Sequence, residues 1–298
     1  MSAWLSNPVA IKELRGRMRG RRAFVVLTLY LLALSGIVTF TYLIYSASAA
    51  IPGSTNARTT GKALFAAILA VQVFLVAFIG PAFTAGAISG ERERQTYDLL
   101  RTTLLPAESF VRGKLISALS YVFLLVLVSI PLQSIAFLLG GLSAVELIVS
   151  QVLILVAAVT YALYGLWCSA AMRSTLAATV ATFAGMLFLL FGIPLIGGAA
   201  ALFLNLWFAT AGSGGGPLTE TLALYAGFIS AATNLPATLL VSEALFIEEN
   251  AIFATSQTIG STRVWLPLPW PLFILFHLLV AYWLYRATVR RVRRVSDK

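Results

Sequence analysis

The sequence is poor in the residues that build metal sites, disulfide bonds and proton relays. It contains one cysteine, Cys168, and one histidine, His277, in 298 residues. A single cysteine excludes a disulfide within the chain and a thiolate metal cluster, and a lone imidazole does not form a metal site by itself. We therefore predict that Cys168 is a small core residue, that His277 is a hydrogen-bonded packing residue, and that the chain uses no metal or cofactor.

Charged residues are also scarce, at 11% of the chain against about 25% in ordinary soluble domains. The mean hydropathy is +0.91. The apolar residues lie in continuous runs of about twenty or more, the length at which a helix crosses roughly 30 Å of hydrocarbon. This composition excludes a water-soluble protein and predicts an all-α, polytopic membrane protein.

Six segments have the length and composition of membrane-spanning helices: residues 23–46, 63–88, 116–139, 145–170, 176–208 and 266–285. Glu146, at the edge of the fourth, is the only Asp, Glu, Lys or Arg inside them. Membrane proton relays are built from carboxylates and histidines, so a proton-driven transporter or channel is disfavoured. The long polar side chains in or beside the spans are interpreted as interhelical hydrogen-bonding groups: Gln72, Gln133, Gln151 and Asn205.

The distribution of Lys and Arg predicts the orientation of these helices. Six basic residues precede the first span, five lie between the second and third, Arg173 lies between the fourth and fifth, and six follow the last. Only Arg58, Lys62 and Arg263 fall on the other side. Because short basic loops stay in the cytoplasm, we expect both termini there and the chain in the inner (plasma) membrane. The net charge of +10 then reflects topology, and no nucleic acid partner is expected.

Residues 1–22 are predicted to form an amphipathic helix at the membrane surface. Asn7-Pro8 is a helix start signal, and the apolar and basic residues that follow fall on separate helical stripes. The residues assigned to the membrane interface are Trp4, Lys12, Arg15 and Arg19. Membrane lipid is therefore a predicted partner, and a basic tail that only sets topology is the alternative. The apolar run that follows is longer than the roughly 7 to 15 residues of a cleaved signal peptide.

Residues 209–265 open with a glycine-rich stretch and are then apolar from 218 to 247. Asn234 and Pro236 divide the apolar run into two pieces too short to cross the membrane, which favours re-entrant or interfacial helices over a seventh span. A seventh span would also place the C-terminal basic cluster outside. Pro194 and neighbouring glycines predict a kink in the fifth span, either a hinge or a static bend.

The segment from 89 to 115, between the second and third spans, is charged and then amphipathic. Tyr97, Leu100 and Leu104 share one face at helical spacing. A proline is predicted to end that helix before a second short helix leads into the third span. An apolar face on a helix that projects from the membrane needs a partner to cover it.

Three motifs, in order, resemble ABC-2 type transporter permeases. Asn-Pro and then Lys-Glu-Leu stand within residues 7–14. Gly-Glu-Arg-Glu, a Thr-x-Asp-Leu-Leu helix, Pro and Gly-Lys follow within residues 90–114, and Ser-Ala-Ala-Met-Arg-Ser-Thr occupies residues 169–175. The resemblance implies a single ABC-2 type transmembrane domain over residues 1–298. The chain departs from the family in its very apolar outer segment and in the single charge of its second cytoplasmic loop.

By this resemblance, residues 7–19 would be a connecting helix at the membrane surface, and residues 95–105 a coupling helix that enters a groove of a separate ABC ATPase subunit. The residues assigned to ATPase coupling are Glu91, Arg92, Glu93, Tyr97, Leu100, Arg101 and Leu104. The outer segment would correspond to the re-entrant helices of the family. The family works as a dimer, so a second copy or a homologous permease is an expected partner.

We therefore expect the permease subunit of an ATP-driven exporter, without catalytic activity of its own. A permease-like scaffold or accessory subunit of a larger membrane complex is the alternative. A phosphate loop before Lys62 fails, because Asn56 and Ala63 stand where glycine and a hydroxyl residue are required. Glu91 and Glu93 either pair with cations at the headgroup boundary or belong to a solvated charge run.

The Lys and Arg distribution gives a direct test of topology. In separate variants, Thr102→Cys and Ser296→Cys should react with a membrane-impermeant thiol reagent only from the cytoplasmic side, and Gly215→Cys only from the outside. Labelling of Ser296→Cys from the outside would contradict the six-span topology and indicate a span within residues 218–247.

Overall fold

The computed structural model describes residues 11, 13, 21–48, 57–95, 106–140, 142–210, 217–249, 254–259 and 262–296. Six helical segments in this part of the chain are long and apolar enough to cross a membrane. They are α2 (Arg21–Ser48), α3 (Ala57–Ala85), α6 (Ala107–Leu138), α7 (Ala144–Ala171), the run of α8 (Thr175–Leu187), η1 (Phe188–Gly192) and α9 (Ile193–Thr210), and α12 (Pro269–Ser296). The six predicted spans and the helical, multi-pass fold class are confirmed.

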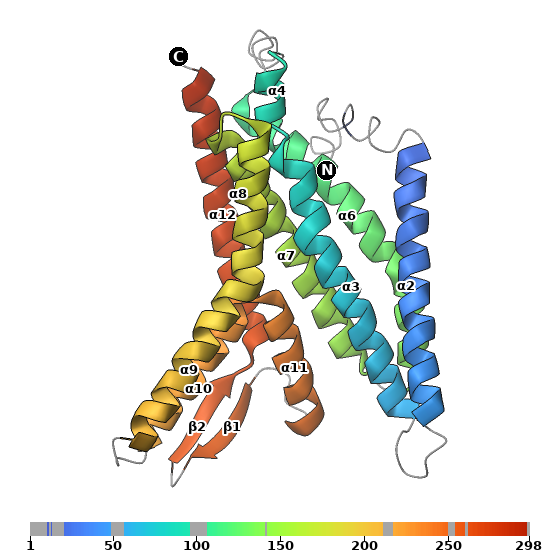
Figure 1. Ribbon diagram of the computed structural model, residues 1–298, viewed down its shortest axis with the longest axis vertical. Coiled ribbons are helices and arrows are strands. Elements are labelled where there is room, and N and C mark those ends of the chain that lie inside the picture. The colour runs from blue at the N-terminus through green and yellow to red at the C-terminus, as the bar shows by residue number, and fades with distance from the viewer. Residues whose placement is uncertain are drawn as a thin grey trace. The chain divides into compact units, whose positions relative to one another are not determined.

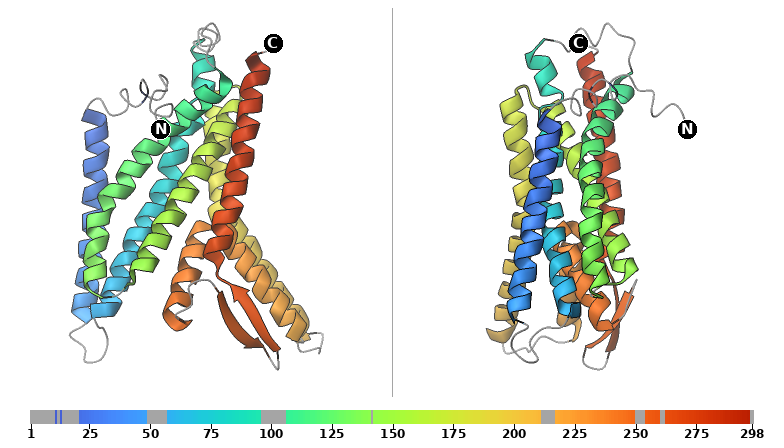
Figure 2. Two further views of the ribbon diagram at one scale, coloured as in Figure 1. Left: turned by 180° about the vertical axis from the view of Figure 1, so that it is seen from behind. Right: turned by 90° about the vertical axis from the view of Figure 1, so that its right-hand side faces the viewer.

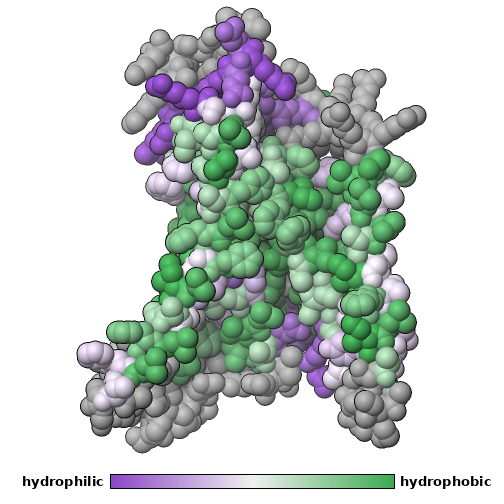
Figure 3. Space-filling model, in the orientation of Figure 1, coloured by the Kyte–Doolittle hydropathy of each residue, from purple (hydrophilic) through white to green (hydrophobic). Residues whose placement is uncertain are grey.

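The chain forms two compact units. Unit 1 is Met1–Phe183 with Ala281–Lys298, and unit 2 is Ala184–Val280. In unit 1 the start of α2, the short helix α4 (Ser89–Glu93) and the last turns of α12 lie at one end, here called the polar end (Figures 1 and 2). Hydrophilic residues gather there, and hydrophobic residues cover the helices below (Figure 3). The cytoplasmic location of this end and the single domain over residues 1–298 stay predictions.

Helices α3 and α7 pack along each other and supply much of the core of unit 1, with Phe65 and Leu153 among their fully buried side chains. Gly165 of α7 faces the turn of α3 that contains Pro81. A Cβ atom at this glycine would lie 3.2 Å from the carbonyl oxygen of Pro81 and would collide with Thr84 Oγ1. The absence of a side chain at Gly165 therefore lets the two helices approach closely.

Helix α2 packs on α3 and α6 through a narrow stripe that includes Tyr30 and Leu34. The rest of its surface is apolar and exposed in this chain, as at Phe24, Leu32 and Phe40. Exposed apolar patches of this extent are rare on soluble proteins, whereas hydrocarbon solvates them well. The surface of α2 is therefore suited to the interior of a membrane.

A hydrogen-bonded cluster of glutamines joins α3, α6 and α7. Gln133 Nε2 and Gln151 Nε2 donate to Gln72 Oε1 over 3.1 Å and 3.3 Å, and Gln72 Nε2 donates to Ser129 Oγ. Gln72, Gln133 and Ser129 are completely buried. The interhelical role predicted for these three glutamines is confirmed; the side chain of Asn205 lies outside the described residues.

The two residues predicted to have packing roles also have them. Cys168 is a free, buried thiol in unit 1. His277 is buried in unit 2, where its Nδ1 lies 3.1 Å from the carbonyl oxygen of Phe273 and its ring stacks on the Phe273 ring at a centroid distance of 3.8 Å. Both predictions are confirmed.

In unit 2, Asn234 stabilises the break in the fifth span. Pro194 has no N–H to donate to the turn before it, which is the π-helix η1. Nδ2 of Asn234 donates to the carbonyl oxygens of Leu189 and Leu190 over 2.9 Å and 3.0 Å, the two acceptors that residue 194 would use in π and α geometry. Oδ1 of the same side chain accepts from the N–H of Ala237 over 3.0 Å and so caps the following helix.

Residues 209–265 contain two helices and a β-hairpin. Helices α10 (Pro217–Thr233) and α11 (Leu235–Glu249) separate at Asn234, as predicted, and their 17 and 15 residues are fewer than the roughly 20 that a span needs. Strands β1 (Ala254–Ile259) and β2 (Thr262–Pro267) pair antiparallel, with Ser256 opposite Trp265. The re-entrant placement of α10 and α11 stays a prediction.

Three predictions for individual segments are wrong. Residues 254–259 and 262–265 form strands rather than interfacial helices, and Leu266 belongs to β2 rather than to the last span, because these strands are rich in the β-branched types that favour them. The separate short helix expected before the third span does not exist. Pro106 is the N-cap of α6, which then runs unbroken through Gly113.

The role of Asn234 predicts a double-mutant result. Asn234→Leu leaves buried carbonyls without a donor and should destabilise the protein by about 1–3 kcal/mol, measured as thermal unfolding in detergent. Pro194→Ala restores an N–H next to the same carbonyls, so Asn234→Leu should cost clearly less in that background. An equal cost in both backgrounds would show that the amide does not compensate for the proline.

Candidate functional site

Helix α4 lies at the polar end of unit 1, directly before the segment 96–105 in the sequence. It ends where the N–H of Arg94 donates to the carbonyl of Gly90 over 3.1 Å and Gln95 takes a φ of 57°. This left-handed conformation terminates a helix. Helix α4 is therefore a separate short element, and four of its residues bond to other helices.

Ser169 of α7 caps α4 from outside. Its Oγ accepts hydrogen bonds from the N–H groups of Ile88 and Ser89 over 2.9 Å and 3.0 Å, and lies 3.2 Å from Ser89 Oγ. Ile88, the N-cap residue of α4, has no polar side chain with which to do this. All three residues are completely buried. The hydroxyl of Ser169 thus satisfies two N–H groups that the helix start leaves open.

Glu91 connects α4 to α6. Lys114 Nζ lies 3.1 Å from Glu91 Oε1 and also forms an ion pair with Glu13. Only 6% of the Lys114 side chain is exposed, against 30% for Glu91. A buried ammonium group is stable only when paired, so Lys114 holds α4 and residue 13 against the start of α6.

Arg92 and Glu93 each bind a helix end whose partial charge is opposite to their own. The guanidinium group of Arg92 donates to the carbonyl oxygens of Ala170 and Met172, at the C-terminus of α7, over 3.3 Å and 3.4 Å. The carboxylate of Glu93 accepts from the N–H and the hydroxyl of Thr175, at the N-terminus of α8, over 2.7 Å each. A cation at a helix C-terminus and an anion at an N-terminus both interact favourably with the helix dipoles.

We call α4 with its partners Lys114, Ser169, Thr175 and the last turn of α7 the α4 clamp. It ties one short helix to three spans through hydrogen bonds and an ion pair. In the described part of the chain, no group of three or more His, Cys, Asp or Glu side chains could hold a metal ion.

The clamp brings together Glu91, Arg92 and Glu93 from the predicted coupling residues. Glu91 pairs with the cation of Lys114, as one of its two interpretations predicts, whereas Glu93 is exposed and binds the start of α8, which neither interpretation predicted. The other predicted coupling and interface residues lie outside the described residues: Tyr97, Leu100, Arg101, Leu104, Trp4, Lys12, Arg15 and Arg19. Their roles stay predictions.

Sequence reasoning missed the partners, although all three stand in motifs that it singled out. Lys114 belongs to the Gly-Lys pair at the start of the third span, and Ser169 and Thr175 begin and end the motif at 169–175. The sequence signal that could have identified them was a polar residue inside a short motif at the junction of two spans. Nothing in the spacing indicated which residue each would contact.

Residues 7–283 match the family described as ABC-2 family transporter protein. The chain belongs to this family. A comparison with curated proteins gives no match. This ABC-2 family member is a multi-pass membrane protein and a transmembrane component of a transporter. The family typically works with an ABC ATPase.

The α4 clamp gives the motifs of this ABC-2 transporter protein a common location. Glu91 and Lys114 from the second motif and Ser169 and Thr175 from the third belong to it, and Glu13 from the first forms an ion pair with Lys114. Segments that are far apart in the sequence therefore meet at one point of unit 1. There they form α4 or contact it or its partner Lys114.

The cap formed by Ser169 predicts a stability difference between two serine variants of α7. Ser169→Ala leaves the N–H groups of Ile88 and Ser89 without their acceptor and should cost roughly 1–3 kcal/mol for each group that stays unpaired. Ser150→Ala is the matched control, because this buried hydroxyl donates only to carbonyls of its own helix, those of Glu146 and Leu147. Thermal unfolding in detergent should show a clear loss for the first variant and almost none for the second. Equal losses would refute the capping role.

Proposed function

We propose that this chain is the permease subunit of an ATP-driven exporter in the plasma membrane. Two such subunits form the translocation pathway and take their energy from separate cytoplasmic ATPase subunits. The chain itself is not catalytic, and ATP hydrolysis takes place on the partner chains. Family membership supports the kind of partner, and the Lys and Arg distribution supports a cytoplasmic location of the polar end.

The observation that carries this proposal is the α4 clamp. Segment 96–105, which we propose to be the ATPase-docking helix, continues directly from α4 at one end and leads into α6 at the other. A displacement of the segment therefore acts on α4, and through Glu91, Arg92 and Glu93 on α6, α7 and α8. Without these contacts, the segment would act only on the two helices that it joins in the sequence.

The polarity of the clamp supports the same interpretation. Its contacts are hydrogen bonds and an ion pair that lie at the ends of helices, where a small rotation of α4 changes their geometry at once. The centre of unit 1, in contrast, is held by the apolar contacts of α3 and α7 and by the buried glutamine cluster. We propose that the clamp transmits the docking movement while this centre stays packed.

The proposal is tested at the predicted docking face. Leu100→Asp should abolish copurification of the ATPase while the permease still inserts, because apolar anchors of an interface contribute about 2 kcal/mol or more when they are hot spots. Thr102→Asp is the matched control: helical spacing places residue 102 away from the apolar face, so this variant should keep the ATPase. The readout is the amount of ATPase recovered with tagged permease from membranes.

Recovery of the ATPase with Leu100→Asp at the wild-type level would contradict docking through this face. A complex that carries Gly215→Cys as its only change, binds the ATPase and shows no ATP-driven change in the labelling of this cysteine would indicate a scaffold subunit. The two failures are distinguishable, since the first concerns binding and the second concerns movement.

A further inference from the structure

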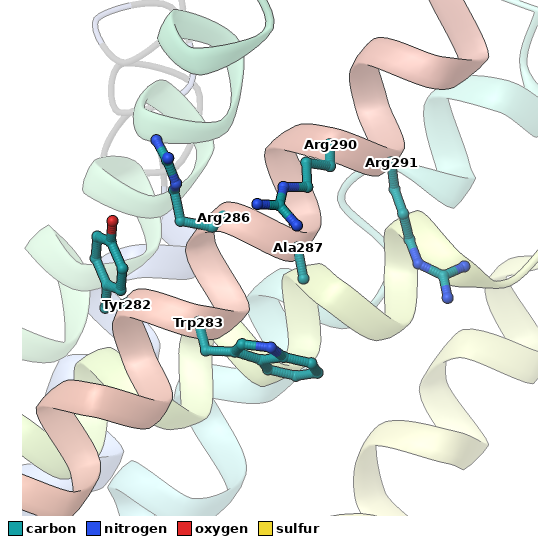
Figure 4. Close-up of a pocket in the computed structure, with 6 residues that line it drawn as sticks. All are labelled: Tyr282, Trp283, Arg286, Ala287, Arg290 and Arg291. Carbon is teal, nitrogen blue, oxygen red and sulfur yellow. The ribbon is translucent and has the colours of Figure 1, made fainter.

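The C-terminal half of α12 carries a pocket of about 370 Å³. It is lined by Tyr282, Trp283, Arg286, Ala287, Arg290 and Arg291 (Figure 4). Residues 282, 286 and 290 follow one another at a spacing of four, and so do 283, 287 and 291, which places the side chains in two neighbouring rows along the helix. The small side chain of Ala287 leaves space between the arginines of the two rows. The pocket lies within unit 1 and shares no residue with the α4 clamp.

Three arginines line the pocket: Arg286 and Arg290 follow one another in one row, and Arg291 projects from the other row toward Trp167. Within the described ranges, no carboxylate forms an ion pair with Arg286, Arg290 or Arg291, whereas Arg293, further along the same helix, lies 3.8 Å from Glu108. Like charges at a spacing of four residues repel each other. An anion bound beside Arg286 and Arg290 removes the repulsion between these two guanidinium groups.

Aromatic residues hold the arginines and mark their depth in the membrane. The guanidinium group of Arg286 lies 5.8 Å from the centre of the Tyr282 ring, and that of Arg291 lies 5.5 Å from the centre of the Trp167 ring on α7. Tyr282 and Trp283 are 62% and 61% exposed. Exposed Tyr and Trp at the end of a span are typical of the level of the lipid headgroups, where one side of the ring meets hydrocarbon and the other meets water.

We propose that this pocket binds the phosphate group of an anionic membrane phospholipid. Guanidinium groups bind phosphate oxygens through short, charge-assisted and often bidentate hydrogen bonds. The pocket volume is in the range of small-ligand sites and exceeds what a bare phosphate ion fills. The exposed rings of Tyr282 and Trp283 offer a surface for the lipid beside the phosphate, which favours a lipid over free phosphate. The site is separate from the proposed coupling function and does not depend on it.

Lipid binding to the purified, delipidated protein tests the proposal. Native mass spectrometry counts the bound molecules during titration with dioleoyl phosphatidylglycerol and, as the neutral comparison, dioleoyl phosphatidylcholine. The double variant Arg286→Gln/Arg290→Gln should bind phosphatidylglycerol about tenfold more weakly, because it loses two charge-assisted contacts. Arg293→Gln removes a charge of the same helix outside the pocket and should keep the wild-type affinity within about twofold.

A second variant separates a shaped site from a merely basic surface. Ala287→Trp keeps every arginine but fills the space between them, so it should also lose the preference for phosphatidylglycerol over phosphatidylcholine. Wild-type binding by this variant and by the double arginine variant would overturn the proposal. Size-exclusion chromatography confirms that each variant is folded before the titration.

The remaining arms identify the source of the phosphate. Millimolar inorganic phosphate should not displace bound phosphatidylglycerol. Complete displacement would show a site for free phosphate and would overturn the lipid proposal. The proposal would also fail if the double arginine variant lost the copurifying ATPase while its phosphatidylglycerol affinity stayed unchanged, because the arginines would then serve protein docking.

Discussion

Hydrocarbon offers no hydrogen-bonding partners, so the protein itself must pair every backbone N–H and C=O group that lies inside the bilayer. Continuous helices meet this requirement along most of the chain, and side chains meet it where a helix breaks. Asn234 supplies the donor that Pro194 cannot provide. Ser169 supplies the acceptor for the N–H groups at the start of α4. The two irregular points that these side chains permit are the π-helix η1 of the fifth span in unit 2 and the short helix α4 at the polar end of unit 1.

Charged groups in the membrane are subject to the same requirement for partners. Apolar spans tolerate few ionic groups, so charges concentrate at helix ends, where dipoles and opposite charges can pair with them. Arg92 and Glu93 use the ends of two consecutive helices, and Lys114 is paired with two carboxylates. The arginines of the α12 pocket are the contrasting case within the described residues. They have aromatic neighbours and no ion-paired carboxylate, which is the basis for assigning them an external anion.

The sequence alone determined the features that depend on local composition. Apolar runs without charges have one stable arrangement in a bilayer, which is why the six spans followed from hydropathy. The separation of α10 and α11 at Asn234 also followed from the sequence, because asparagine favours helix caps and Pro236 cannot donate to a preceding turn. Glu91, Arg92 and Glu93 were assigned to ATPase coupling because they match a family motif, and that role stays a prediction. The β-hairpin escaped prediction because its strands are short, and a short strand carries a weak periodic signal.

Only the tertiary structure decided which charged or polar group meets which partner. Glu93 and Thr175 are 82 positions apart, and Ser169 is 80 positions from Ser89, so no helical spacing relates them. Their contacts exist because α3 and α7 pack closely enough, at Gly165, to bring the polar ends of both helices together. The pairing of Lys114 with Glu91 and Glu13 likewise depends on where three segments converge. Composition and local spacing specify the helices and their polarity, whereas the packing of distant helices fixes the contacts between them.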